Sequence, residues 1–159
     1  VASAASDVYK RQSVDKEKAA HGEGSGAYAV ALGNLATLLQ AQGKYGEALP
    51  LKKEVIEVKK KLYGEEHKEV ATGLNNLALL LKKMDPKHWD DAAAMYRQAL
   101  EIYKKALGGD HPHVASGRNT LALRLQKMGP KHWDDAAAMH RQALEIIKQA
   151  LGGHHPHVA

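Results

Sequence analysis

Apolar residues recur along this chain with the period of an α-helix. Val70, Leu74, Leu77 and Leu81 follow one another at three- and four-residue intervals, so they share one helical face. A second stripe of this kind consists of Ala92, Met95, Ala99, Ile102 and Ala106. Charged residues fill the remaining positions of both segments. Each stripe therefore predicts an amphipathic helix that buries one side against a neighbour.

Glycine and proline residues indicate where these helices begin and end. Gly43 and Gly129 can end the first helix of a pair in the left-handed conformation. The second helices are closed by Gly64, Gly108 and Gly152. Pro112 suits the first turn of a helix, because the N–H that proline lacks has no partner there. The chain is therefore expected to alternate a first and a second helix, joined by short loops.

The two-helix pattern occurs more than once. The ten residues from Pro86 to Met95 recur unchanged from Pro130 to Met139, a shift of 44 residues. With that shift, residues 65–108 match residues 109–152 at 31 of 44 positions, and an earlier copy aligns after a shift of 42. Such a period predicts an array of stacked supersecondary units rather than a domain folded around one active site.

The copies predict how the chain is organised. We expect a lead-in helix in residues 1–21, three repeats in residues 22–64, 65–108 and 109–152, and the start of a fourth in residues 153–159, where residues 155–159 repeat residues 111–115. One helix pair cannot bury both of its faces alone, whereas stacked pairs can. The C-terminal side of the third repeat is therefore expected to be open for docking.

Both ends of the sequence look like fragment ends, because the chain lacks an initial Met and stops inside a repeat. The stretch from Ser6 to Gln12 also resembles translated sequencing-adapter read-through, in which case residues 1–12 would not be native. The alternative is that they belong to a real helix. The sequence alone leaves both interpretations open.

Composition agrees with a helical globular protein: 44% of the 159 residues are hydrophobic, 26% are charged, and Phe is absent. Without Cys there are no disulfides or thiolate metal sites. A net charge of +5 gives weak support for an acidic partner and weaker support for nucleic acid. No apolar run approaches the ~20 residues that span a bilayer. We expect a soluble, intracellular protein, with the organelle left open.

No catalytic motif is found. The sequence contains no Cys nucleophile, no Gly-x-Ser-x-Gly and no His-Glu-x-x-His. Residues 22–26 are glycine-rich but lack the Lys-Ser/Thr ending of a phosphate-binding loop. Neither an enzyme nor a cofactor is expected.

Histidine and tryptophan residues receive structural interpretations first. His111 and His155 each precede a proline and are expected to cap a helix, while the tract of histidines 154, 155 and 157 could capture Zn²⁺ or Ni²⁺ adventitiously. We predict no physiological metal site. Trp89 and Trp133 should pack against the preceding helix; the alternative is that they anchor a partner on the loop side.

Several segments in fixed register resemble the tetratricopeptide repeat: Asn75 to Ala78, Tyr96 to Ile102, Ala106 to Gly108, and His111-Pro112. The closest branch is similar to the long-period repeats of kinesin light chains and nephrocystin-like proteins. The resemblance covers residues 22–159 and implies an all-α, right-handed superhelical solenoid of antiparallel helix pairs. Two features depart from it, the residues inserted before Trp89 and Trp133, and Ser25-Gly26 in place of His-Pro. These departures affect the loops and the first turn, and they do not change the fold class.

In that family the first helix of each repeat lines a concave groove. The resemblance therefore implies a partner-binding groove formed by Val30, Asn34, Thr37 and Gln40, by Thr72, Asn75, Leu79, Lys82 and Lys83, and by Ser116, Asn119, Leu123, Gln126 and Lys127. Asn side chains can donate to and accept from an extended backbone, and lysines attract carboxylates. Related light chains bind acidic peptides containing Trp, so this ligand class is implied. The alternative is that Asn75 and Asn119 tie neighbouring helices together.

Two functions remain in view. One is a non-catalytic adaptor that binds a protein or peptide segment, acidic in character, in the groove. The other is a permanent subunit of a large assembly, docked through its edges and convex face. A nucleic-acid-binding surface is a distant third.

Overall fold

The computed structural model describes residues 4–152, and within them every regular element is a helix. The all-α prediction is confirmed. The elements are α1 (Ala4–His21), α2 (Gly26–Ala41), α3 (Tyr45–Tyr63), α4 (Lys68–Met84), α5 (Trp89–Leu107), α6 (Pro112–Gln126) and α7 (Trp133–Gly152), with two short 3-10 turns, η1 (Pro86–His88) and η2 (Pro130–His132).

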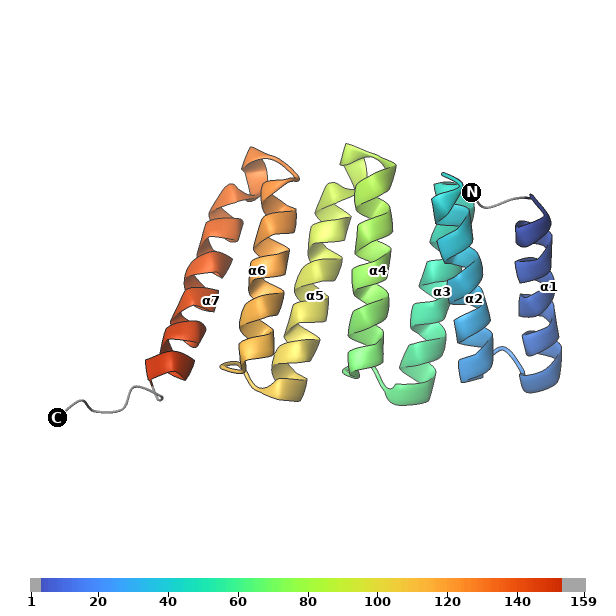
Figure 1. Cartoon of the computed structure of the whole chain (residues 1–159), viewed down its shortest axis with the longest axis horizontal. Coiled ribbons are helices and arrows are strands. Elements are labelled where there is room, and N and C mark those ends of the chain that lie inside the picture. Colours follow the sequence, from blue (N-terminus) through green and yellow to red (C-terminus); the bar gives the residue numbers. More distant parts are fainter. Residues whose placement is uncertain (1–3, 153–159) are drawn as a thin grey trace.

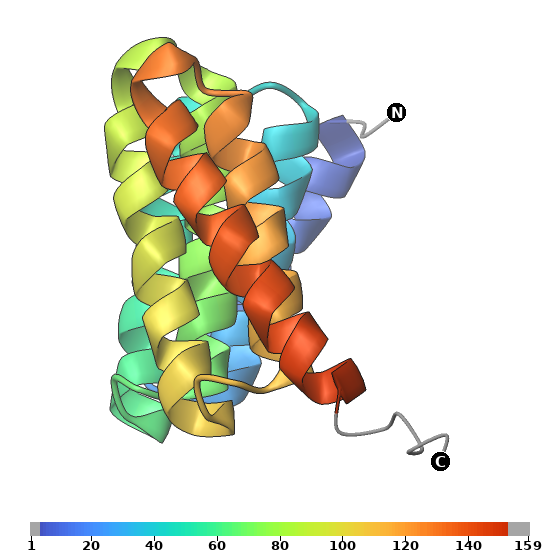
Figure 2. The same ribbon diagram turned by 90° about the vertical axis from the view of Figure 1, so that its left-hand side faces the viewer.

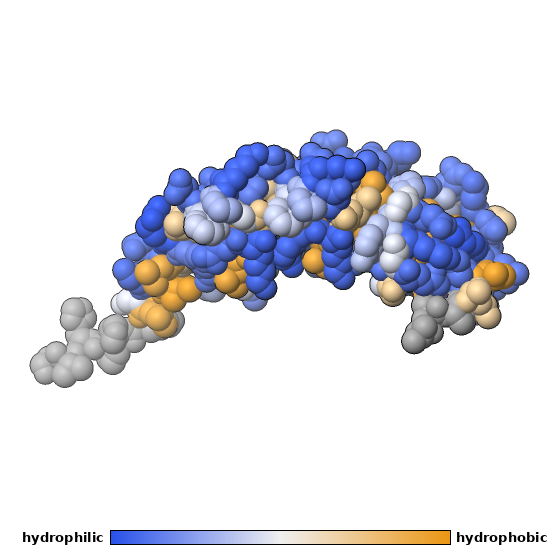
Figure 3. Space-filling model, turned by 90° about the horizontal axis from the view of Figure 1, so that it is seen from above, coloured by the Kyte–Doolittle hydropathy of each residue, from blue (hydrophilic) through white to orange (hydrophobic). Residues whose placement is uncertain are grey.

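The helices stand side by side in one row and alternate in direction (Figure 1). Seen from the end, α2 and α6 lie on one side of the array and α3 and α5 on the other (Figure 2). From above, the array is a crescent (Figure 3), whose hollow side is the side on which α2 passes in front of α3 in Figure 1. The first helices of the pairs, α2, α4 and α6, therefore line the concave face of a helical solenoid.

The predicted stripe of α4 is buried as expected. Val70, Leu74, Leu77 and Leu81 are each 5% exposed or less. In α5 the stripe was only partly right: Ala92, Ala99 and Ile102 are buried and Met95 is half-buried, but Ala106 is exposed together with its neighbours in the last turn.

A helix inside a solenoid also buries more than one face, and a single stripe does not describe this. On α5, Tyr96 and Leu100 are buried in addition to the predicted positions, at 2% and 7% exposure. They face α6, the first helix of the next pair, as shown by Leu100 lying against Gly117. The second-helix sequence therefore encodes contacts both within its repeat and to the following one.

Short polar side chains cap the first helices. Ser25 Oγ accepts a hydrogen bond from the Tyr28 N–H, His67 Nδ1 accepts from the Glu69 N–H, and His111 Nδ1 accepts from the His113 N–H. The predicted cap at His111 is confirmed, and His155 lies outside the described residues. Ser25 thus replaces His in the first repeat without loss of the cap, because either side chain supplies an acceptor to the free N–H groups of the first turn.

Two glycines allow consecutive repeats to come close together. A Cβ on Gly73 of α4 would lie 2.9 Å from Ile56 Cγ1 of α3, and one on Gly117 of α6 would lie 3.3 Å from Leu100 Cδ1 of α5. The two glycines occupy the same place in successive repeats. Each marks the joint at which a second helix meets the first helix of the next repeat.

The duplicated tryptophans close the turn within each repeat. Trp89 Nε1–H donates to the Lys82 carbonyl oxygen at 3.2 Å, and Trp133 Nε1–H donates to the Gln126 carbonyl oxygen at 3.3 Å. Each indole therefore donates to a carbonyl near the end of the preceding helix, and the Gln126 carbonyl also accepts from the Gly129 N–H. The expected packing against that helix is confirmed, although Trp133 remains 56% exposed.

The two copies of the decapeptide also touch each other. Asp90 of the first copy pairs with Lys131 of the second, and its Oδ1 lies 3.2 Å from His132 Nε2. The bond from Lys131 is the main reason that the pKa of Asp90 is lowered. The inserted Pro-Lys-His turn is thus part of the contact between the second and third repeats.

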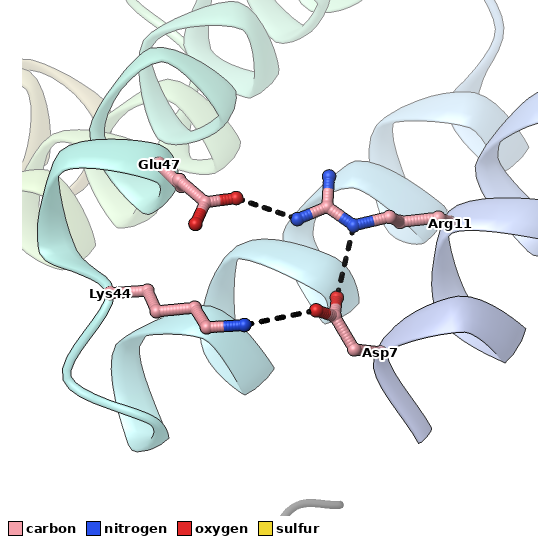
Figure 4. A network of polar contacts seen from close by, with 4 residues as sticks. All are labelled: Asp7, Arg11, Lys44 and Glu47. Carbon is pink, nitrogen blue, oxygen red and sulfur yellow. Dashed lines mark hydrogen bonds and ion pairs between the residues drawn. The ribbon is translucent and has the colours of Figure 1, made fainter. Parts of the chain in front are cut away.

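The lead-in helix α1 is joined to the array by charged contacts (Figure 4). Asp7, a buried acidic residue, pairs with Arg11 at 3.1 Å and with Lys44, next to α3, at 3.2 Å; Arg11 in turn pairs with Glu47 at 2.7 Å. The network spans α1 and the start of α3. It ties the lead-in helix to the first repeat.

The phenol of Tyr28 predicts how stability responds to alkaline pH. Burial, followed by the 2.7 Å hydrogen bond to Glu54, raises its pKa to about 12. The folded chain therefore holds a proton that the unfolded chain loses above pH ~10. We expect the unfolding free energy to decline between pH ~10 and ~12, as measured by urea unfolding.

Two variants check this assignment. Tyr28→Phe should lose about 1 kcal/mol at neutral pH, because the hydrogen bond is absent, and should show a shallower alkaline decline. Tyr9→Phe, at a position 73% exposed, is the control and should behave as the unsubstituted chain does. An alkaline decline that is equally steep in Tyr28→Phe would contradict the role of this phenol.

Candidate partner-binding groove

Three hollows open on the concave face, each between consecutive first helices. One, of about 310 Å³, lies between α2 and α4 over α3. A second, of about 200 Å³, lies between α4 and α6 over α5. The third, of about 290 Å³, continues the second toward the C-terminal ends of α4 and α6. We call them the α2/α4 hollow, the middle hollow and the basic hollow.

The structure distributes the predicted groove residues over these hollows. The α2/α4 hollow is lined by Val30, Asn34 and Thr37. Asn75 and Ser116 line the middle hollow. Leu79, Lys82, Leu123 and Lys127 line the basic hollow. The groove residues predicted from the resemblance therefore include residues that line each of the three hollows.

Five predicted residues line none of the hollows: Gln40, Thr72, Lys83, Asn119 and Gln126. Thr72 is held by its own surroundings, since Oγ1 donates to the Lys68 carbonyl and lies 3.2 Å from the Tyr103 hydroxyl. Lys83, the only lysine among these five, is exposed and lies near Lys52. The pKa of Lys52 is lowered mainly by burial and further by the charge of Lys83.

The two asparagines at equivalent positions differ. Asn119 Oδ1 lies 2.9 Å from His140 Nδ1 of α7, a hydrogen bond when that nitrogen carries the proton. In the second repeat the corresponding residues are Asn75 and Tyr96, and no hydrogen bond joins them. Asn119 therefore connects two helices, which is the alternative the sequence offered, whereas Asn75 faces the middle hollow.

Sequence reasoning missed Arg124, Tyr96 and Tyr103, which also line the middle hollow. The Arg124 guanidinium lies over the Tyr96 ring, 4.5 Å from its centroid. A signal was present in the sequence, because Arg124 stands 44 residues after Leu80 and replaces a buried leucine by a cation. A comparison of the copies for changes of charge would have found it.

Positive charge concentrates in the basic hollow. Burial lowers the pKa of Lys82, and the nearby cations Lys127 and Arg124 lower it further. Within residues 4–152 no carboxylate pairs with any of the three, whereas elsewhere Lys59 pairs with Glu69 and Lys104 with Glu101. Two partly exposed leucines, Leu79 and Leu123, share this hollow. The site offers cations and apolar surface together, a combination suited to an acidic segment with hydrophobic side chains.

Metal-binding groups do not gather in the part of the chain that the structure describes: it contains no set of three His, Asp or Glu side chains placed to hold an ion. His111 and His113 stack with ring centroids 5.0 Å apart. The tract of His154, His155 and His157 lies outside the described residues.

Comparison with protein families identifies the repeat. Two family descriptions, both named Tetratricopeptide repeat, match residues 27–105 and 114–157. The chain belongs to the tetratricopeptide repeat family. This confirms the resemblance seen in the sequence. Tetratricopeptide repeats are generally non-catalytic and serve protein–protein interaction, so the chain is an interaction scaffold with protein partners.

Solved structures share the tetratricopeptide solenoid. BtubC (BKLC) from P. vanneervenii matches with a TM-score of 0.76 and 23% identity over 97% of this chain and 59% of its own. A putative kinesin light chain from Podosopora anserina with nearly identical TPR-like repeats gives 0.74 at 20% identity, over 91% and 67%. A variant form of the same protein gives 0.74 at 19% identity, over 92% and 67%. The fold is that of kinesin-light-chain-like arrays, and this chain spans only 59% of the first.

No curated protein sequence matches the tetratricopeptide chain significantly. In the described part of the chain, no helix combines the length and the apolar character needed to cross a membrane.

Proposed function

We propose that this protein is an adaptor that holds an extended, acidic segment of a partner protein in the concave groove of α2, α4 and α6. The observation that carries the proposal is the group of unpaired cations beside exposed leucines in the basic hollow. The three cations Lys82, Arg124 and Lys127 repel one another in the free protein. Binding of an acidic partner therefore relieves this electrostatic repulsion.

The middle hollow supports the same proposal. Asn75, Ser116 and Thr120 bring an amide and two hydroxyls to its wall, and both groups can donate to or accept from a peptide backbone. Because this hollow adjoins the basic one through Thr120 and Arg124, one extended segment can occupy both. The cations then select a segment with negative charge. The polar wall fixes the register of that segment through hydrogen bonds to its backbone.

Binding of acidic peptides tests the groove directly. We expect a labelled acidic peptide containing Trp to bind with an affinity of about micromolar, as measured by fluorescence anisotropy, and to weaken as salt is raised. Asn75→Ala and Lys82→Gln should each weaken binding by about three- to tenfold, because each removes one contact of about 1 kcal/mol.

The matched control is Lys53→Gln, which removes an exposed lysine of α3 that lines none of the three hollows. It should leave the affinity within about twofold, since it changes the net charge equally without touching the groove. If Asn75→Ala and Lys82→Gln bind as tightly as this control, the groove assignment is wrong.

A permanent subunit of a larger assembly is the second candidate. Leu144, Ile147 and Leu151 recur along α7 and are 50%, 38% and 63% exposed. Leu144 stands 44 residues after Leu100, which packs on the first helix of the next repeat, so this stripe is a repeat-to-repeat surface. Co-purification with fixed stoichiometry through high salt would support a subunit, whereas a partner released by salt would support the adaptor.

A further inference from the structure

The middle and basic hollows together contain more positive charge than an ordinary acidic residue would balance. Lys82, Arg124 and Lys127 converge from α4 and α6, and no carboxylate of residues 4–152 pairs with them. The α2/α4 hollow provides the contrast, since its cation Lys59 is already paired with Glu69 at 2.8 Å. Unpaired cations also occur outside the hollows, such as Lys52 beside Lys83, but among the three hollows only the middle and basic ones contain them.

Arg124 lies against an aromatic ring. Its guanidinium carbon lies over the Tyr96 ring, 4.5 Å from the centroid, and no carboxylate within residues 4–152 pairs with its N–H groups. Tyr96 is itself 2% exposed, and its hydroxyl lacks a hydrogen-bond partner of ordinary geometry within the described chain. An arginine that has no carboxylate partner and is flanked by two further cations is suited to a group with several acceptor oxygens.

The cause of the hollow lies in one replacement between the repeats. Leu80 fills the joint between α2 and α4, where it is fully buried with Leu35, Leu39 and Ala48. Arg124 has the equivalent place in α6, 44 residues later, but it lines both hollows instead of filling a core. The joint between the second and third repeats thus exchanges apolar packing for an open cationic site.

We propose that the Arg124 site binds a phosphorylated serine or threonine of the partner segment, so that phosphorylation of the partner controls its capture. This inference rests on the adaptor function proposed above and specifies its regulation. A phosphate monoester brings a charge of about −1.5 to −2 and three acceptor oxygens at neutral pH, whereas a carboxylate brings one charge and two oxygens. Three converging cations match the phosphate better on both counts. Thr120 and Ser116 add hydroxyls at the wall of the same site.

Three forms of one labelled peptide test the proposal. The peptide carries leucines on either side of an acidic centre, and the central position is phosphoserine, glutamate or serine. We expect the phosphoserine form to bind at least about tenfold tighter than the glutamate form, because charge-assisted bonds to phosphate are stronger and more numerous. Equal affinity of the phosphoserine and glutamate forms would overturn the proposal while leaving the adaptor function intact.

Arg124→Leu assigns the effect to this site. The variant restores the residue of the preceding repeat, so we expect it to fold, and circular dichroism checks this. It should reduce the preference for phosphoserine over glutamate to within about twofold, whereas Lys53→Gln should keep the full preference. A preference that survives in Arg124→Leu would place phosphate recognition elsewhere and overturn the assignment.

A measurement without peptide separates the two proposals. Inorganic phosphate added to the isotope-labelled chain should produce saturable NMR shifts centred on the Arg124 Nε–H and on residues next to Lys82 and Lys127. Acetate at the same ionic strength should produce much smaller shifts. If phosphate shifts these resonances no more than acetate does, the site is not a phosphate site. Failure of all three peptides to bind would instead refute the adaptor function.

Discussion

Replacement of Leu80 by alanine should lower the free energy of unfolding by about 2–5 kcal/mol, the largest effect we expect from a single substitution in this chain. Leu80 is fully buried in a cluster with Leu35, Leu39 and Ala48, and this cluster joins α2, α3 and α4. Removing its side chain therefore leaves a cavity shared by two repeats, which neither repeat can close alone.

Urea unfolding followed by far-UV circular dichroism measures this effect. Leu123→Ala is the matched control, because Leu123 is a leucine of a first helix but is 52% exposed. It should change stability by no more than about 0.5 kcal/mol. Equal effects of the two substitutions would mean that the joint between the first and second repeats contributes little to stability.

Replacement of Gly73 by alanine should destabilise the protein by about 1–3 kcal/mol, although alanine is the better helix former. The added Cβ would lie 2.9 Å from Ile56 Cγ1 and 3.9 Å from Ile56 Cα. Since Ile56 is buried at 4% exposure, its β-branched side chain has little room to move away. Helix α4 would have to shift from α3 to relieve the contact.

Gly117→Ala tests the same position one repeat later and should behave differently. Its Cβ would lie 3.3 Å from Leu100 Cδ1, the end of a flexible side chain that can rotate away. The gain in helix propensity, about 1 kcal/mol, can then offset the contact, so we expect a change near zero or slightly stabilising. Thermal unfolding of the two variants side by side measures the difference. If Gly117→Ala loses as much stability as Gly73→Ala, room for the neighbouring side chain does not determine the outcome.

The architecture was predictable because it depends on periodicity, which a sequence displays directly. The α4 stripe of Val70, Leu74, Leu77 and Leu81, the cap at His111 and the packing of Trp89 all follow from spacing and from local chemistry, and the structure confirms each. Repetition strengthens this reasoning, because an assignment made in one copy can be checked in the next.

Contacts between repeats were harder to predict, because they depend on where successive helices come to lie. The burial of Tyr96 and Leu100 beside α6 was not part of the predicted stripe, and neither was the exposure of Ala106. The pairing of Asn119 with His140 was open as an alternative but could not be chosen, since residue spacing does not determine the relative placement of two helices.

The groove assignments remain proposals for the same reason. Resemblance places Asn75 and Lys82 on the inner face, and the structure finds both beside hollows. Their role in binding depends on a partner that neither sequence nor fold describes. What the structure adds is Arg124, whose importance comes from the ring beneath it and from the absence of a nearby carboxylate in the described chain.

The contact of Asp90 with Lys131 and His132 has a consequence for how such a protein can lengthen. Each copy of the decapeptide carries the acidic half of this joint near the start of the second helix and the basic half in the turn just before. A tandem duplication of the coding segment therefore delivers both halves at once. A chain enlarged in this way would contain a complete ionic joint at its new boundary.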